Sequence, residues 1–84
     1  MSYSKERLEQ VWDKGQDVKG KNPNLYREDI EGNLMYKYSY GKQSDMGWEV
    51  DHSKPKSKGG TDHLNNLQPM QWGENRSKGN KYKK

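Results

Sequence analysis

The side chains best suited to chemistry lie between residues 47 and 80. Asp51 and His52 are adjacent. Asn66 follows His52 by 14 positions, and Asn75 follows Asn66 by nine. An imidazole titrates near neutral pH, so His52 can accept a proton from water without being permanently charged. A lone Asp-His pair is more often a surface pair, and a lone Asn is more often a turn residue, so we interpret these four residues as a set.

Basic residues surround this set. Pro55 lacks a backbone N–H and biases its predecessor towards an extended conformation, so residues 53–58 are not expected to form a helix. An extended chain repeats every two residues, which predicts that three lysines share one side of the segment. Gly59 and Gly60 then permit a sharp reversal. The candidates for contact with a phosphate are Lys54, Lys56, Lys58, Arg76 and Lys78.

Length and charge limit the kinds of protein that this chain can be. It has 84 residues, no cysteine and a net charge of +4, so a large α/β enzyme and a thiolate zinc site are both excluded. Residues 1–51 carry 8 basic and 10 acidic residues, whereas residues 52–84 carry 8 basic and 2 acidic residues. The second segment favours a polyanionic partner, either nucleic acid or an anionic membrane surface. No apolar stretch predicts a membrane span or a signal peptide, so we expect an intracellular protein.

The segment from residue 47 to residue 80 resembles the HNH nuclease family. The matching elements are Asp51-His52 at the end of a strand, a Lys-Pro-Lys-Ser-Lys-Gly-Gly loop, Asn66-Leu67-Gln68, and Glu74-Asn75-Arg76-Ser77-Lys78-Gly79. The resemblance implies a small α+β domain with a ββα-metal motif. In that motif an antiparallel hairpin with an extended loop is followed by a helix, and the two clasp one divalent ion. An N-terminal helix and an extra strand are expected to precede it.

The resemblance also implies a role for each residue of the set. His52 would be the general base, Asn66 would orient it and fix the loop, and Asp51 and Asn75 would hold the metal ion. The family is named for His, Asn and His, but the third position here is Asn75. The HNH domain of RNA-guided CRISPR nucleases is similar in having Asn there, so the change does not argue for inactivity. Carboxylate and amide oxygens are hard ligands, which favours Mg²⁺ or Mn²⁺ over Zn²⁺.

The first element expected to support this motif is a helix over residues 4–14. Leu8, Val11 and Trp12 have the spacing of one helix face. Ser4 is placed as the N-cap, and Gly15 follows the end. We expect this helix to pack one apolar stripe against the rest of the fold.

Strands are expected to follow. Leu34 and the tyrosines at positions 36, 38 and 40 alternate with other residues, which predicts a half-buried strand over 34–40. Residues 25–30 fit either a helical turn or an extended segment. Adjacent strand residues point to opposite faces, so Asp51 and His52 can share a site only where a strand ends. The remaining expected elements are a strand over 48–51, a short strand at 67–68 and a helix over about 71–78.

Two other groups of residues have simpler interpretations. His63 lies in a polar turn, and we interpret it as a surface residue. Trp12, Trp48 and Trp72 could stack on bases, but in a chain without Phe we expect them to form the core.

The leading hypothesis is a metal-dependent DNA endonuclease, with double-stranded DNA as the expected substrate and no membrane partner. It would act in a bacterial cytoplasm or, if encoded by a phage or virus, inside the host. A homodimer or a larger complex is compatible with the sequence. The alternatives are a non-catalytic nucleic-acid-binding module of a phage or mobile-element complex, and a toxin nuclease domain. We expect one domain over 1–84, in which 1–46 support the motif at 47–80 and 81–84 form a basic tail.

Overall fold

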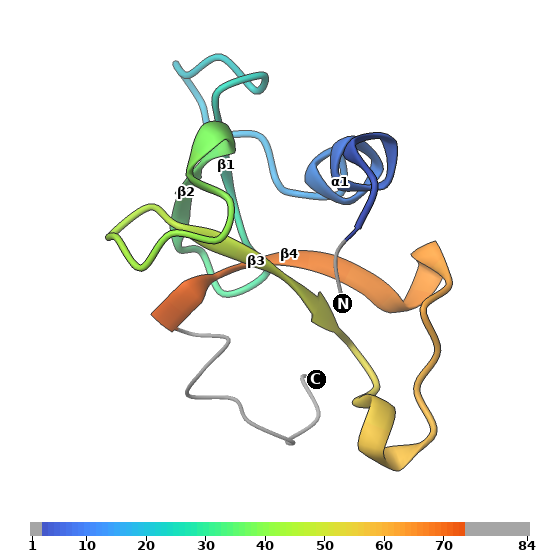
Figure 1. Cartoon of the computed structure of the whole chain (residues 1–84). Coiled ribbons are helices and arrows are strands. Elements are labelled where there is room, and N and C mark those ends of the chain that lie inside the picture. The colour runs from blue at the N-terminus through green and yellow to red at the C-terminus, as the bar shows by residue number, and fades with distance from the viewer. Residues whose placement is uncertain (1–2, 74–84) are drawn as a thin grey trace.

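The computed structural model describes residues 3–73, where one helix and two small antiparallel sheets form an α+β fold (Figure 1). Helix α1 spans Lys5–Trp12. The Oγ of Ser4 accepts a hydrogen bond from the backbone N of Arg7 at 3.0 Å, so the predicted N-cap is confirmed. The helix ends two residues earlier than predicted, because the N–H groups of Lys14 and Gly15 donate to carbonyls three residues back. Within residues 3–73, no helix is long and apolar enough to cross a membrane.

The first sheet pairs β1 (Tyr26–Glu28) with β2 (Leu34–Tyr36). Residues 25–30, which fitted either a helical turn or an extended segment, contain β1, so the middle of this segment is extended. The strand predicted over 34–40 is wrong beyond Tyr36, where a 3-10 turn covers Lys37–Ser39. The N–H of Lys37 still donates to the carbonyl of Leu25, at 2.8 Å, so the last bond between the two chains is made at the residue where the turn begins. The alternation would place the tyrosines on the buried face, but Met35 is fully buried whereas Tyr38 is 63% exposed.

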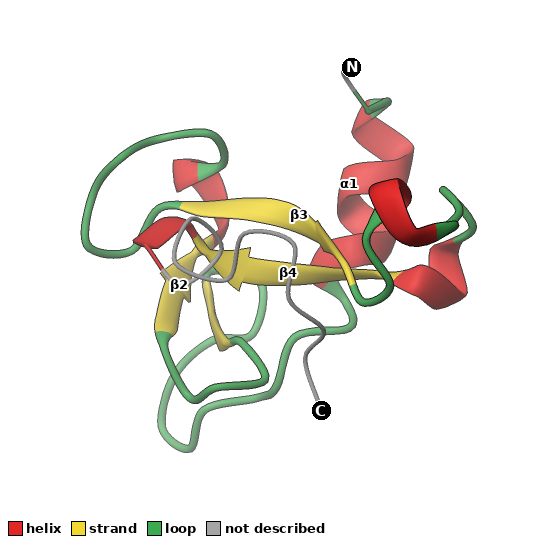
Figure 2. Ribbon diagram, turned by 90° about the horizontal axis from the view of Figure 1, so that it is seen from below, coloured by secondary structure: helices red, strands yellow, loops and turns green. Residues whose placement is uncertain are grey.

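The second sheet is the hairpin of β3 (Trp48–His52) and β4 (Leu67–Gln71), which crosses the centre of the molecule (Figure 2). Its register places Trp48 opposite Gln71 and His52 opposite Leu67. Both strands were predicted, and both are longer than the sequence pattern indicated. After β4, residues 72 and 73 have helical backbone. The rest of the predicted helix at 71–78 lies outside the described residues.

The hydrophobic core joins the helix to both sheets. Trp12 and Trp48 are nearly fully buried, with ring centroids 5.2 Å apart, so their predicted core role is confirmed. Trp72 is only partly buried and is not part of the core cluster, so the same prediction is wrong for it. Each indole N–H donates to a backbone carbonyl, of Pro23 and Lys37 respectively. Helix α1 packs on β4. The buried residues of the cluster are Val11, Trp12, Met35, Trp48 and Leu67.

Candidate active site

The adjacent residues Asp51 and His52 are the last two residues of β3. Their side chains leave the strand on opposite sides, because successive strand residues point to opposite faces. Asp51 is only 4% exposed, and its Oδ2 accepts a hydrogen bond from the Nε2 of Gln68 at 2.8 Å. Gln68 is its partner in the strand register. The pairing between strands therefore fixes the carboxylate of Asp51.

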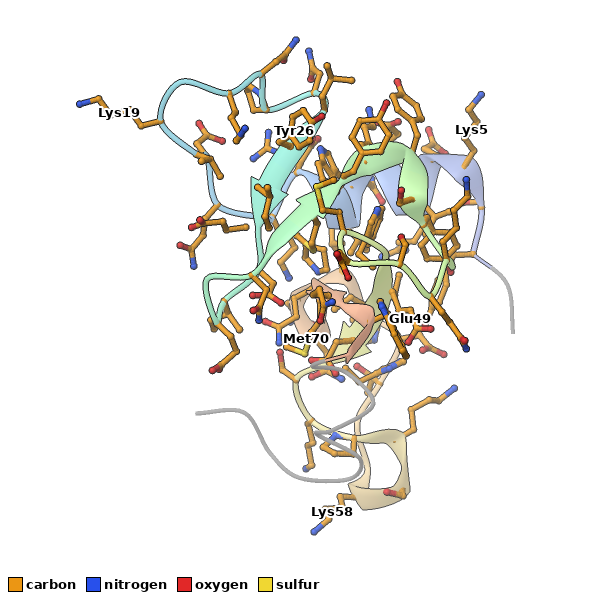
Figure 3. All side chains as sticks on the ribbon, turned by 90° about the vertical axis from the view of Figure 1, so that its left-hand side faces the viewer. Lys5, Lys19, Tyr26, Glu49, Lys58 and Met70 are labelled. Atoms are coloured by element: carbon orange, nitrogen blue, oxygen red, sulfur yellow. The ribbon has the colours of Figure 1, made fainter. Side chains whose placement is uncertain are left out.

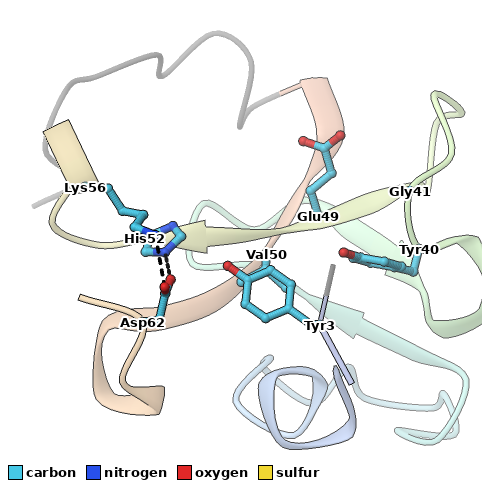
Figure 4. Close-up of a pocket in the computed structure, with 8 residues that line it drawn as sticks. All are labelled: Tyr3, Tyr40, Gly41, Glu49, Val50, His52, Lys56 and Asp62. Carbon is cyan, nitrogen blue, oxygen red and sulfur yellow. Dashed lines mark hydrogen bonds and ion pairs between the residues drawn. The ribbon is translucent and has the colours of Figure 1, made fainter. Parts of the chain in front are cut away.

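The imidazole of His52 lies against a carboxylate from the loop between the strands. Its Nε2 is 2.7 Å from Oδ1 of Asp62 (Figure 4). The other oxygen of this carboxylate, Oδ2, accepts a hydrogen bond from Nζ of Lys56 at 3.0 Å. The bonds from His52 and then from Lys56 hold the pKa of Asp62 below its usual value. The His52 side chain is 18% exposed and that of Asp62 39%. The contact thus lies at the boundary between protein and solvent.

Asn66 links the two ends of the loop that joins β3 to β4. Its Oδ1 accepts a hydrogen bond from the backbone N of Lys54 at 2.9 Å, and its Nδ2 donates to the carbonyl of Lys54 at 3.1 Å. The same Nδ2 donates to the carbonyl of Thr61 at 2.8 Å, and the Asn66 carbonyl accepts from the N–H of Ser53 at 2.9 Å. One side chain thus ties the start of the loop to the residue that precedes Asp62.

The three lysines of the loop do not form the single row that an extended chain predicts. The prediction is wrong because a 3-10 turn covers Lys56–Lys58. Pro55 begins this turn, since its fixed φ of −58° suits a turn entry and its carbonyl accepts from the N–H of Lys58. Gly59 then adopts the left-handed φ of 91° that the predicted reversal requires. Lys54, Lys56 and Lys58 are all exposed.

A cavity of about 370 Å³ opens beside His52. It lies beside β3, and Figure 4 shows Tyr3 and Tyr40 facing it from the side opposite Glu49. Burial is the main cause that raises the pKa of each tyrosine, so both phenols stay neutral at physiological pH. Asp51 does not line this cavity. The lining residues are Tyr3, Tyr40, Gly41, Glu49, Val50, His52, Lys56 and Asp62.

The metal ligands implied by the resemblance are only partly within the described residues. Asn75, Arg76 and Lys78 lie outside them. Within residues 3–73, no three or more His, Cys, Asp or Glu side chains cluster closely enough to hold a metal ion. Asp51 supplies a carboxylate, and Mg²⁺ is commonly held by one or two such groups together with water and substrate phosphate. The donor type of Asp51 therefore fits a hard divalent ion with few protein ligands.

Asp62, Tyr3 and Tyr40 are neighbours of His52 that the sequence pattern did not indicate. Asp62 is ten positions from His52 and six from Lys56. Both contacts are made across a loop and not within one helix or strand, so no periodic pattern could have indicated them. His63, the residue after Asp62, is exposed, which confirms its interpretation as a surface residue.

Comparison with known families gives one result. The model of the family described as HNH endonuclease matches residues 39–81, about half of the chain. The match includes Asp51, His52, Asn66 and Asn75. Neither the curated proteins nor the solved structures contain a significant match. Members of the matched family act on nucleic acids and typically bind a divalent metal ion.

Proposed function

Because the chain belongs to the HNH endonuclease family, we propose that it is a metal-dependent endonuclease that hydrolyses phosphodiester bonds in DNA. In this proposal His52 is the general base, Asn66 fixes the loop beside it, and Asp51 and Asn75 hold one Mg²⁺ or Mn²⁺ ion. We further propose one domain over residues 1–84, in which 1–46 support the motif at 47–80, with the basic tail at 81–84.

The observation that carries this proposal is the position of His52. It is the last residue of β3, it is partly exposed, and it lines the cavity beside that strand. A general base must reach a water molecule next to the substrate, and a histidine packed inside the core would not. The match to the HNH family includes this residue. An accessible imidazole at a fixed strand end therefore supports proton abstraction from water.

Phosphodiester hydrolysis also needs stabilisation of the negative charge that builds up on the phosphate oxygens. When bound, a divalent ion supplies this as a Lewis acid. Asp51 contributes a carboxylate oxygen held by Gln68, and Asn75 would contribute an amide oxygen. The exposed lysines of the loop, Lys54, Lys56 and Lys58, together with Arg76 and Lys78, would bind the backbone phosphates and keep the anionic substrate in place.

The test is cleavage of supercoiled plasmid by the purified chain with Mg²⁺ or Mn²⁺. We expect nicked or linear product, no product with EDTA, and loss of activity in His52→Ala. His63→Ala is the matched control, because His63 is exposed and does not line the cavity. It should cleave like the wild type. Equal cleavage by His52→Ala and wild type would show that His52 is not the base.

A non-catalytic nucleic-acid-binding module is the second candidate, and one observation favours it. Asp51 is almost fully buried and does not line the cavity beside His52. A chain of this kind would bind DNA with strong dependence on salt concentration and would cleave none under any divalent ion. The same plasmid assay, run beside a DNA-binding measurement, separates this candidate from the endonuclease.

A further inference from the structure

The carboxylate of Asp62 contacts two functional groups of the cavity at once. Its Oδ1 lies 2.7 Å from Nε2 of His52, and its Oδ2 lies 3.0 Å from Nζ of Lys56. The three residues come from the end of β3, a 3-10 turn and the segment after Gly60. Figure 4 shows both side chains converging on this carboxylate at one end of the cavity.

The backbone at Asp62 is held in place independently of these two contacts. Thr61, the preceding residue, accepts a hydrogen bond from Nδ2 of Asn66 at 2.8 Å. Gly60 passes so close to the loop start that a Cβ there would lie 1.8 Å from the carbonyl oxygen of Lys54. The close approach and the Asn66 bonds fix the chain that carries Asp62 relative to the end of β3. The backbone on both sides of this approach is held by its own contacts, which keep the Asp62 carboxylate close to His52.

The contact determines which imidazole nitrogen carries the proton. An ionised carboxylate only accepts hydrogen bonds, so the Nε2 that faces it must be the protonated nitrogen. In the neutral ring the lone pair is then on Nδ1, and Nδ1 is the atom that accepts a proton from water. When the ring becomes positively charged, the carboxylate at Nε2 stabilises that charge. The contact with Asp62 thus favours one orientation and one tautomer of the ring.

We propose that Asp62 is a positioning residue for the hydrolysis proposed above. Through Oδ1 it fixes His52 with its lone pair on Nδ1, and through Oδ2 it holds the ammonium group of Lys56 at the rim of the same cavity. Lys56 there binds a phosphate oxygen of the substrate close to the base. This inference rests on the proposed endonuclease activity and adds a residue that contacts neither substrate nor metal.

Asp62→Asn is the informative substitution, because it keeps the shape and changes the hydrogen-bonding groups. The ammonium group of Lys56 can only donate, so it favours the amide oxygen. The amide nitrogen then faces Nε2 and favours the wrong tautomer, with the proton on Nδ1. We expect kcat to fall by about 100-fold, at the lower end of what a general base contributes, with a smaller change in KM. Asp62→Glu keeps the acceptor and should recover part of the lost kcat.

Two further variants serve as controls. One tests the Lys56–Asp62 contact alone, and the other changes a carboxylate elsewhere on the surface. Lys56→Met removes the phosphate-binding ammonium group and its bond to Oδ2 of Asp62, but it keeps the contact between Oδ1 of Asp62 and His52. It should therefore raise KM for plasmid DNA and lower kcat much less than Asp62→Asn does, by no more than about threefold. Asp45→Asn changes an exposed carboxylate outside the cavity and should match wild type. A kcat for Asp62→Asn within about twofold of wild type would overturn the inference.

A second readout does not need catalysis. The ring ¹⁵N chemical shifts of His52, assigned by their loss in His52→Ala, report the tautomer, and the spectra are recorded at alkaline pH because an imidazole is neutral there. We expect the Nε2–H tautomer in the wild type and a shift towards Nδ1–H in Asp62→Asn. His63 is an internal reference in each spectrum and should not change. The Nδ1–H tautomer in the wild-type protein would overturn the inference even if no Asp62 variant folds.

These outcomes distinguish the inference from the function on which it rests. If the wild type cleaves no DNA, or if His52→Ala cleaves as well as wild type, the proposed function fails and Asp62 has no base to position. If the wild type cleaves, His52→Ala does not and Asp62→Asn keeps full kcat, only the inference fails.

Discussion

Lys14 donates a hydrogen bond from Nζ to the carbonyl oxygen of Leu64 at 2.7 Å, across 50 residues of sequence. The same ammonium group also donates to the carbonyl of Leu67. Leu64 begins a 3-10 turn and Leu67 begins β4, so the lysine joins the residues after α1 to the chain on both sides of Asn66. Burial lowers the pKa of Lys14, as expected for a cation drawn towards the protein interior. Through Lys14, the N-terminal segment forms hydrogen bonds with residues 64 and 67, inside the segment that matches the family.

Lys14→Met should therefore destabilise the fold. The substitution keeps the aliphatic stem and leaves two carbonyl oxygens without this donor, a loss of about 1–3 kcal/mol in the free energy of unfolding. Urea denaturation followed by tryptophan fluorescence measures the change. Lys19→Met, at an exposed position in a loop, is the control and should leave the denaturation midpoint unchanged. Equal midpoints for the two variants would show that the Lys14 contact does not stabilise the fold.

Asp29 should be equally important to stability. Its carboxylate is 1% exposed and accepts hydrogen bonds from the backbone N–H groups of Glu31, Asn33 and Gln71, at 2.8–3.0 Å. The bond to Gln71 ties the turn between β1 and β2 to the end of β4. Asp29→Ala leaves all three donors without this acceptor, and we expect a loss of about 3 kcal/mol. Thermal unfolding measured by circular dichroism should show a large drop in Tm, whereas Asp45→Asn should not.

The pKa of Asp62 gives a test in acid. Its folded pKa is lowered, by the bond to His52 first and by Lys56 second. The stabilisation is therefore fully present above the usual Asp pKa of about 3.9, and it is lost as the pH falls through the lowered folded value. We expect His52→Ala to raise the Asp62 pKa more than Lys56→Met does. Carboxyl ¹³C titration by NMR measures both shifts, and the reverse order would contradict the contacts described.

The dependence of DNA binding on salt tests the surface that meets the phosphates. Lys58 is exposed in the loop beside the candidate site, and Lys19 lies at the opposite end of the molecule (Figure 3). If Lys58 contacts a phosphate, Lys58→Ala should reduce the slope of log K against log salt concentration by about 1. Lys19→Ala should leave the slope unchanged. Fluorescence anisotropy with a labelled duplex, in EDTA to prevent cleavage, gives both slopes.

The local pattern of the sequence was sufficient to predict several elements. The helix at residues 5–12 follows from an apolar stripe and a Ser N-cap, and both strands of the hairpin were anticipated. The strand at 34–40 was not predicted correctly, because alternation of tyrosines cannot tell which face the rest of the fold covers. Met35 is the buried residue because it packs into the core with Trp12 and Trp48 from other elements, and the strand ends at Tyr36, where the 3-10 turn begins.

The sequence by itself determined the residue types of the candidate site, since the order and spacing of Asp51, His52 and Asn66 indicate the family without a structure. Only the tertiary structure decided what surrounds His52. The contact with Asp62 depends on a loop that turns at Gly59 and Gly60 and is held by Asn66, and no short-range periodicity specifies that closure. The predicted row of Lys54, Lys56 and Lys58 is absent for the same reason, because the loop forms a 3-10 turn where an extended segment was expected. Spacing along the chain predicts local geometry, but a loop is folded by the contacts that it makes with the rest of the protein.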